Sequence, residues 1–262
     1  MLNEFYYKNV NHFIFNKINS KDYGLLVDKT QGVYGSPKPV IETVNVPGRG
    51  NLIINKKADP YDNDEYEDIP KSYNVHIVPD SVAEQTTEML ARAIYRWLYG
   101  AGTKYLNLED SYEPNYYRKA YVAEMMSVER IAQGLLSTLT IEFTCQAYKY
   151  LISGLESITL TNATGGGVLY NPEGFTASPL IKVIGSGNIV LYINDREHHM
   201  TIPVGDEYIM IDSERMNSYR ESVLKNANTK FTYYPKLVAG ANDISWSGNV
   251  SQIDIIPRWC TL

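Results

Sequence analysis

The residues with the clearest potential for chemistry lie in the loop NVPGRGNL, where Gly48 and Gly50 flank Arg49 just after Pro47. Glycine-rich loops that carry a basic residue often bind phosphate, but a P-loop needs GxxxxGK[ST] between a strand and a helix. The dipeptide Gly-Lys occurs nowhere in the chain, and GxGxxG is absent as well. The run 100–104 (GAGTK) follows a predicted helix, so no helix N-terminus faces an anion there. Phosphate binding is therefore not the expected role.

The stiffness of this loop indicates a different role. Pro47 restricts its own φ, whereas Gly48 and Gly50 allow conformations that are closed to other residues. Arg49 is then held on a rigid corner, where its guanidinium can pair bidentately with a carboxylate of another strand or of a neighbouring chain. The sequence thus predicts a structural clasp at Pro47, Gly48, Arg49 and Gly50.

The acidic run 59–68 (DPYDNDEYED) lacks the spacing of a calcium loop. An EF-hand loop that began at Asp62 would need an oxygen ligand at its fifth position and a glycine at its sixth. Tyr66 and Glu67 stand at those positions. We expect a solvated or partner-facing loop.

The cysteines and histidines also form no recognisable metal site. Cys145 and Cys260 belong to no CxxC or Cys/His cluster. His198 and His199 are adjacent in a predicted strand, so their side chains should point to opposite faces and cannot share one metal without a bulge. The sequence predicts no metal site and no cofactor.

Motifs for catalysis are missing too. The chain has no GxSxG and no HExxH, and no acid–base pair can be placed with geometry. His76 lies in the apolar run VHIV and reads as an ordinary strand residue. We predict no catalytic residue and do not expect an enzyme. Trp246 and Trp259 could stack on a sugar if they were exposed, but both lie on or beside apolar β-runs typical of a core.

Most elements that would position these residues are β-strands. Residues 139–145 (LTIEFTC) alternate apolar and polar side chains, which predicts a strand with one buried face. Further strands are expected at 189–193, 200–202, 208–211 and 252–256, with a turn at Asn194-Asp195. Short strands separated by Gly, Pro, Asn and Asp favour β-sandwiches over βαβ units.

One helix is predicted at about 81–99. Ser81 and Glu84 fit a capping box, and Gly100 and Gly102 supply the stop. An apolar stripe recurs at three- and four-residue spacing and should pack against a sheet; its members are Met89, Leu90, Ala93, Ile94, Trp97 and Leu98.

Composition narrows the classes of function. The chain has 262 residues and a net charge of −6, so it lacks the basic excess that drives non-specific binding to nucleic acid. No run approaches the about 18–20 apolar residues of a membrane span, and no leader or disulfide framework is visible, which leads us to expect a protein folded in a reducing cytoplasm. Its 22 tyrosines suit strands and surfaces that become buried against a partner.

A domain boundary is expected after the strand that ends at Cys145. The stretch 147–171 is interpreted as a connector with one short strand at 157–161 and a flexible turn at the triple glycine 165–167. We predict a first domain at 1–146, which contains the helix, and an all-β second domain at 147–262.

The order of motifs resembles the distal tail protein (Dit) family of long-tailed phages that infect Gram-positive bacteria. Residues 15–25 (FNKINSKDYGL) are similar to its opening pattern, except that Lys17 stands where glycine is usual. Residues 46–52 (VPGRGNL) are similar to its V-P-G-R-x-G-x-L signature, one residue shorter. Looser matches follow in order at 97–98, 106–110, 116–120, 143–145, 178–187, 211–214, 234–237, 240–244 and 256–259. No single motif is specific, but the ordered set is.

This resemblance implies an N-terminal β-sandwich with one helix and a hairpin, followed by a galectin-like β-sandwich. It implies six copies in a ring at the virion tail tip, assembled in the host cytoplasm. The ring would join the tail tube protein to the tail-associated (tail fibre or lysin-type) protein and, in many phages, to a receptor-binding protein. DNA would pass through its channel without specific recognition, and no membrane contact is implied. The candidate structural or interface residues are Pro47, Gly48, Arg49, Gly50 and Trp97.

Two readings of function stay open from sequence. The first is a structural hub without catalysis. The alternative is a glycan-binding module whose second domain contacts the host cell wall through Trp246 or surface tyrosines, although the galectin-type motifs HxNxR and WxxExR are missing. A hydrolase is the least supported.

Overall fold

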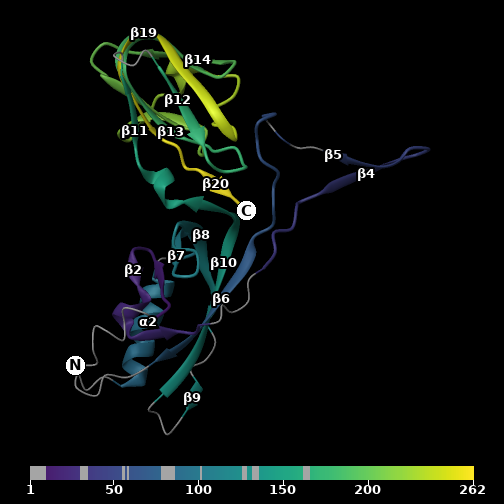
Figure 1. Ribbon diagram of the computed structural model, residues 1–262, viewed down its shortest axis with the longest axis vertical. Coiled ribbons are helices and arrows are strands. Elements are labelled where there is room, and N and C mark those ends of the chain that lie inside the picture. Colours follow the sequence, from purple (N-terminus) through teal and green to yellow (C-terminus); the bar gives the residue numbers. More distant parts are fainter. Residues whose placement is uncertain are drawn as a thin grey trace. The chain divides into compact units, whose positions relative to one another are not determined.

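The computed structural model describes residues 10–29, 35–54, 57, 59–77, 86–100, 102–125, 129–131, 136–161 and 166–262. The fold is mainly β, as expected, and α2 is the α-helix among these residues (Figure 1). The chain divides into two compact units. Unit 1 comprises Met1–Val40, Glu65–Lys149 and Leu262, and unit 2 comprises Ile41–Asp64 and Tyr150–Thr261. No described helix is long and apolar enough to cross a membrane.

Unit 1 is built on one sheet whose strands follow the order β2-β1-β7-β8-β10-β6-β3, with β9 paired to β10. In β10 the predicted alternation is confirmed, because Leu139, Ile141, Phe143 and Cys145 are all buried. The elements are β1 Phe13–Phe15, β2 Ile18–Asn19, the 3-10 helix η1 Ser20–Tyr23, β3 Leu25–Val27, β6 Ile69–Ile77, β7 Leu106–Asp110, β8 Tyr116–Met125, β9 Glu129–Ile131 and β10 Leu136–Leu151.

Helix α2, Thr87–Tyr99, packs its apolar stripe into the same core. Its first turn differs from the prediction: Thr86 is the N-cap and accepts a hydrogen bond from the Met89 N–H, so the helix begins six residues later than expected. Ser81 and Glu84 lie outside the described residues. The predicted end at Gly100 is confirmed. Met89 is 58% exposed and thus does not belong to the buried stripe.

Unit 2 is built on a second sheet with the order β11-β19-β13-β15-β16-β17, to which β12 and β14 add on β19 and β13. All the strands predicted between residues 189 and 256 are present, and the turn at Asn194-Asp195 joins β13 to β14. The elements are η3 Ile152–Leu155, β11 Ile158–Thr161, β12 Gly167–Asn171, β13 Leu180–Ile193, β14 Arg196–Ile202, β15 Tyr208–Asp212, β16 Asn217–Arg220, β17 Val223–Leu224, η4 Asn226–Asn228, β18 Thr229–Lys230, β19 Gly240–Ile256 and β20 Cys260–Thr261.

Each unit has its own hydrophobic core. That of unit 1 gathers around Phe13, Tyr73 and Phe143, and that of unit 2 around Ile181, Leu191 and Ile253. Strands β4 (Glu42–Val46) and β5 (Gly50–Ile54) form a separate two-stranded sheet (Figure 1).

Candidate functional site

The loop NVPGRGNL forms the turn of the β4–β5 hairpin. The Arg49 N–H donates to the Val46 carbonyl at 2.9 Å, which closes the turn. Gly48 and Gly50 have φ values of +82° and +76°, a region that favours glycine. Because a strand follows this loop and no helix does, the structure provides no helix dipole for a phosphate there.

Much of the hairpin is exposed to solvent. Ile53 is 71% exposed, and Val44 on the opposite strand is exposed as well, as are Val40 and Ile41 just before β4. An isolated two-stranded hairpin is marginally stable in water, and exposed apolar side chains in one segment mark an interaction surface. The side chain of Arg49 makes no hydrogen bond or ion pair to the part of the chain that the structure describes. The hairpin therefore presents an exposed cation and exposed apolar side chains.

Trp97, the other candidate residue, lies inside unit 1. It is buried, and its Nε1–H donates to the Phe15 carbonyl at 3.2 Å. Its ring stacks on Phe13 and Tyr23, with centroids 5.7 and 4.8 Å away. This placement makes Trp97 a core residue of unit 1 that fixes α2 to the sheet.

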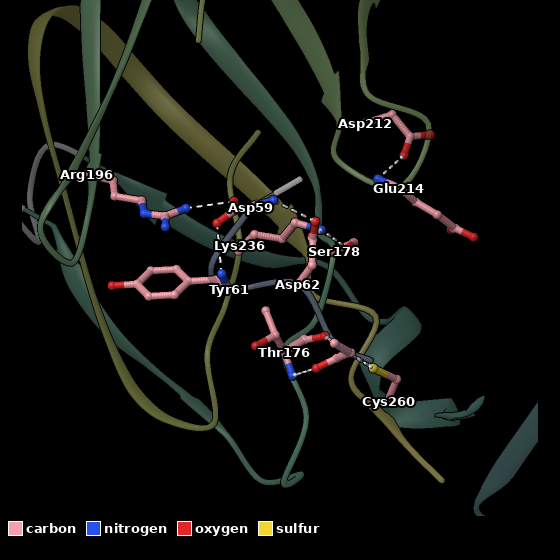
Figure 2. Close-up of polar contacts among 11 residues, drawn as sticks. Asp59, Tyr61, Asp62, Thr176, Ser178, Arg196, Asp212, Glu214, Lys236 and Cys260 are labelled. Carbon is pink, nitrogen blue, oxygen red and sulfur yellow. Dashed lines mark hydrogen bonds and ion pairs between the residues drawn. The ribbon is translucent and has the colours of Figure 1, made fainter. Parts of the chain in front are cut away.

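One extended polar arrangement in unit 2 surrounds residues Asp59–Asn63, which we name the strap (Figure 2). Asp59 is only 4% exposed, and its Oδ2 accepts a hydrogen bond from Arg196 Nη1 at 2.7 Å. Burial raises the pKa of the Asp59 carboxyl. The hydrogen bonds from Arg196 and the Tyr61 backbone, together with the nearby positive charge, lower this pKa by more than burial raises it, so it lies below its ordinary value. Asp59 is thus a buried anion with a matched cation.

Aromatic rings flank that cation. The Arg196 guanidinium lies 3.7 Å from the centroid of the Tyr61 ring and 4.9 Å from that of Tyr233. The Tyr61 hydroxyl donates to Asp195 Oδ1 at 3.1 Å. Arginine over an aromatic face gains a cation–π attraction in addition to its ion pair.

The rest of the strap binds just as specifically. Asp62 pairs with Lys236 at 2.8 Å, and Lys236 also donates to Ser178 Oγ at 3.0 Å. The amide of Asn63 donates to the Thr176 carbonyl at 2.7 Å and accepts from the Thr176 N–H at 2.9 Å. The expectation of a solvated or partner-facing loop is therefore wrong for Asp59, which is buried, whereas Pro60, Asp64 and Glu65 are exposed and residues 61–63 are half-buried.

Metal and thiol chemistry find no support in the described residues. Among them, no group of three or more His, Cys, Asp and Glu side chains is placed to hold a metal ion. Burial raises the pKa of the Cys145 and Cys260 thiols to about 12, so neither is a thiolate nucleophile near neutral pH. His198 is buried and His199 exposed, which confirms that they point to opposite faces.

The tryptophans considered for sugar stacking are both engaged with the core of unit 2. Trp259 is buried, and Trp246 is half-buried and packs against the core. Tyr170 is the most exposed tyrosine of unit 2 among the described residues. Trp259 therefore offers no open ring face to a sugar.

His198 gives unit 2 an acid-sensitive stability. Burial, with the charge of Arg196, lowers the pKa of the imidazole to about 4, below the ordinary value of about 6.5. Protonation is then easier in the unfolded chain, so stability falls as pH drops from about 6.5 toward 4. We expect unit 2 to lose about 2 kcal/mol between pH 7 and pH 5 from this group, measured by urea unfolding.

The variant His198→Gln tests this assignment, because it should remove most of the pH dependence between pH 7 and pH 5. Equal slopes in the wild type and in His198→Gln would show that another group carries the effect.

Comparison with known proteins supports the fold. No protein-family model matches the sequence, and no curated protein sequence matches it. Among solved structures, the Dit protein of phage SPP1, described as a paradigm of the hub adsorption apparatus in phages that infect Gram-positive bacteria, gives a TM-score of 0.65 at 12% identity, covering 97% of this chain and 100% of that one. Chains of the phage P2 baseplate in its activated conformation with Ca or Sr give a TM-score of 0.53 at 10% and 11% identity, covering 94% of this chain and 97% of theirs.

The fold of the chain is thus that of a phage distal tail protein along nearly its whole length. The resemblance that the ordered motifs indicated is confirmed at the level of the fold. The strap site was not predicted, although Asp-Pro-Tyr-Asp-Asn carries a turn signal, because proline and Asx residues favour turns. What no local pattern shows is that this turn meets Arg196 and Lys236.

Proposed function

We propose that the protein is a structural, non-catalytic hub of a phage tail tip. Six copies form a ring that joins the tail tube protein to the tail-associated protein and, in turn, to a receptor-binding protein, with DNA passing through the channel. The two compact units act as the two β-sandwich domains that the sequence resemblance implies, the second of them galectin-like. The site of action is the virion tail tip, after assembly in the host cytoplasm.

One observation carries this proposal: the likeness to the SPP1 Dit protein extends over 97% of the chain, with no large part of either chain left unmatched. Two properties of the chain agree with it. The β4–β5 hairpin exposes apolar side chains, which are the kind of surface that ring subunits bury on assembly. A net charge of −6 offers little attraction to a passing DNA backbone.

The ring is tested by mass. A hexamer of 29.7-kDa chains has a mass of about 178 kDa, which light scattering coupled to size exclusion measures directly. Because subunits of a tail can wait for a nucleating partner, the purified chain is also mixed with its tail neighbours and imaged by electron microscopy. Complete, infectious tails in particles that lack this chain would contradict the proposal.

Within the ring, Arg49 is the proposed clasp on a carboxylate of the neighbouring subunit. Arg49→Ala should weaken assembly by about 2–5 kcal/mol, if the partner carboxylate is buried, and should change the unfolding free energy of the subunit by less than about 0.5 kcal/mol, since Arg49 is exposed. Arg215→Ala, at another exposed arginine, is the matched control. Wild-type assembly in Arg49→Ala would rule out the clasp.

A further inference from the structure

The strap contacts the rest of unit 2 through specific ion pairs and hydrogen bonds, as a bound peptide contacts its binding site. We propose that Arg196, Lys236 and Thr176 form a peptide-binding site on unit 2, whose ligand is an acidic turn with an aromatic ring and whose resident ligand is the strap of the same chain. Occupancy of this site controls the freedom of the β4–β5 hairpin. The proposal concerns the isolated chain and does not depend on ring formation.

Charge matching supports a specific site. The Asp59–Arg196 pair has side chains that are 6% and 18% exposed, so the ion pair is largely removed from water. Surface ion pairs contribute little, whereas loss of one partner from a buried pair leaves an uncompensated charge. Asp62 and Lys236 repeat the same polarity at a second point. Two anions at fixed spacing therefore meet two cations.

The backbone of unit 2 adds a contact that selects for an amide side chain in the ligand. Asn63 exchanges two hydrogen bonds with the N–H and the carbonyl of Thr176, as a paired strand residue would. Its amide also lies 3.9 Å from Cys260 Sγ. Because a carboxylate cannot donate to a carbonyl, an amide is the group that fits this position.

The strap is also preorganised for binding. The Asp59 N–H donates to Asp62 Oδ2 at 3.1 Å, and the Tyr61 N–H donates to Asp59 Oδ1 at 2.8 Å. A third bond, from the Asp62 N–H to the Asp59 carbonyl at 2.9 Å, closes the turn, and Pro60 restricts φ within it. A ligand already held in its bound shape loses less entropy when it binds.

The strap follows the β4–β5 hairpin in the same segment of the chain, so binding of the strap affects the hairpin. The segment Ile41–Asp64 belongs to unit 2, and its two ends are held together in unit 1, where the Val40 N–H donates to the Glu65 carbonyl at 2.9 Å. With the strap bound, Asp64 is the one residue of the chain between the strap and Glu65, where unit 1 resumes. With the strap released, the segment 41–64, which includes the hairpin, loses its contacts with Arg196, Lys236 and Thr176, while the Val40–Glu65 hydrogen bond still joins its two ends. Binding of the strap thus restricts the hairpin.

The first test measures hydrogen exchange of the Thr176 amide, which donates to Asn63 Oδ1, in the full-length chain. We expect this amide to exchange at least tenfold faster in Arg196→Ala/Lys236→Ala than in the wild type, because release of the strap removes its acceptor. Arg215→Ala should exchange like the wild type. Unchanged exchange in the double variant, with β13 and β19 still protected, overturns the proposal. If the double variant does not fold, Lys236→Ala alone is measured by the same criterion.

The second test supplies the ligand from outside. A capped synthetic peptide of residues 57–65 is titrated into the full-length variant Asp59→Asn/Asp62→Asn, whose own strap carries no charge. We expect the peptide to bind this variant at least tenfold more tightly than the wild type, whose site is filled. A peptide that itself carries both Asn substitutions should lose this tenfold gain in affinity. Equal affinity for the wild type and the variant, or none for either, overturns the proposal.

Dilution identifies which chain supplies the strap. A strap bound within its own chain keeps the Thr176 amide protected from exchange when the protein is diluted tenfold, because an intramolecular contact does not depend on concentration. Protection that falls on dilution would assign the strap to the site of a second copy and would overturn the proposal.

Discussion

Lys71→Ala should lower the unfolding free energy of unit 1 by about 3–5 kcal/mol, because it leaves a buried carboxylate without its cation. Lys71 Nζ lies 2.5 Å from Asp110 Oδ2, and the two side chains are only 4% and 3% exposed. Burial raises the pKa of Asp110, but Lys71 and further hydrogen bonds lower it more, so the carboxyl stays ionised near neutral pH. Without Lys71, that charge keeps only its neutral donors.

The remaining donors to Asp110 are neutral and do not compensate its charge when Lys71 is removed. The Tyr73 hydroxyl donates to Asp110 Oδ2 at 2.6 Å, and the N–H groups of Tyr112 and Glu113 donate to Oδ1. Urea unfolding of Lys71→Ala measures the loss, and Lys71→Met/Asp110→Leu should lose less than the sum of the two single variants. A loss below about 1 kcal/mol in Lys71→Ala would contradict the assignment of a buried ion pair.

Trp97→Ala should cost unit 1 a comparable amount, about 3–5 kcal/mol, because a large buried ring leaves a cavity. The indole fills the space between Phe13 and Tyr23, and its N–H satisfies the Phe15 carbonyl. Trp97→Phe keeps most of the packing and loses the hydrogen bond, so its cost should be about 1–2 kcal/mol. Urea unfolding distinguishes the two values.

Met89 is the matched control on the same helix. It stood in the same apolar stripe in the sequence, but it is 58% exposed. Met89→Ala should therefore change stability by less than about 0.5 kcal/mol. If Met89→Ala and Trp97→Ala cost the same, α2 does not pack through the face that contains Trp97.

Short-range periodicity predicted much of the fold. The strand at 139–145 and the hairpin around Asn194-Asp195 follow from alternation and turn chemistry alone, since neighbours in sequence decide both. The end of α2 at Gly100 was equally local. The start was not, because Ser81 and Thr86 are both acceptable caps, and the sequence does not say which one begins the helix.

The polar sites could not be predicted in the same way, because their partners are far apart in the chain. Asp59 and Arg196 are 137 residues apart, and an acidic turn gives no sign of which distant cation it meets. Lys71 does give a signal in the sequence, because it stands on the same face of β6 as Ile69 and Tyr73, where a lysine is unusual. A charge on a buried face signals a partner without naming it.

The strap and its binding site are encoded in two distant parts of the gene, which matters when genes recombine. A recombination crossover near residue 150 would transfer the part of unit 2 that follows it, Tyr150–Thr261. It would leave behind residues 41–64, so that an acidic turn from one parent would meet Arg196 and Lys236 positions from the other. A chimaera that keeps the turn and its cations from the same ancestor avoids this mismatch, which ties two distant stretches of the gene to a shared history.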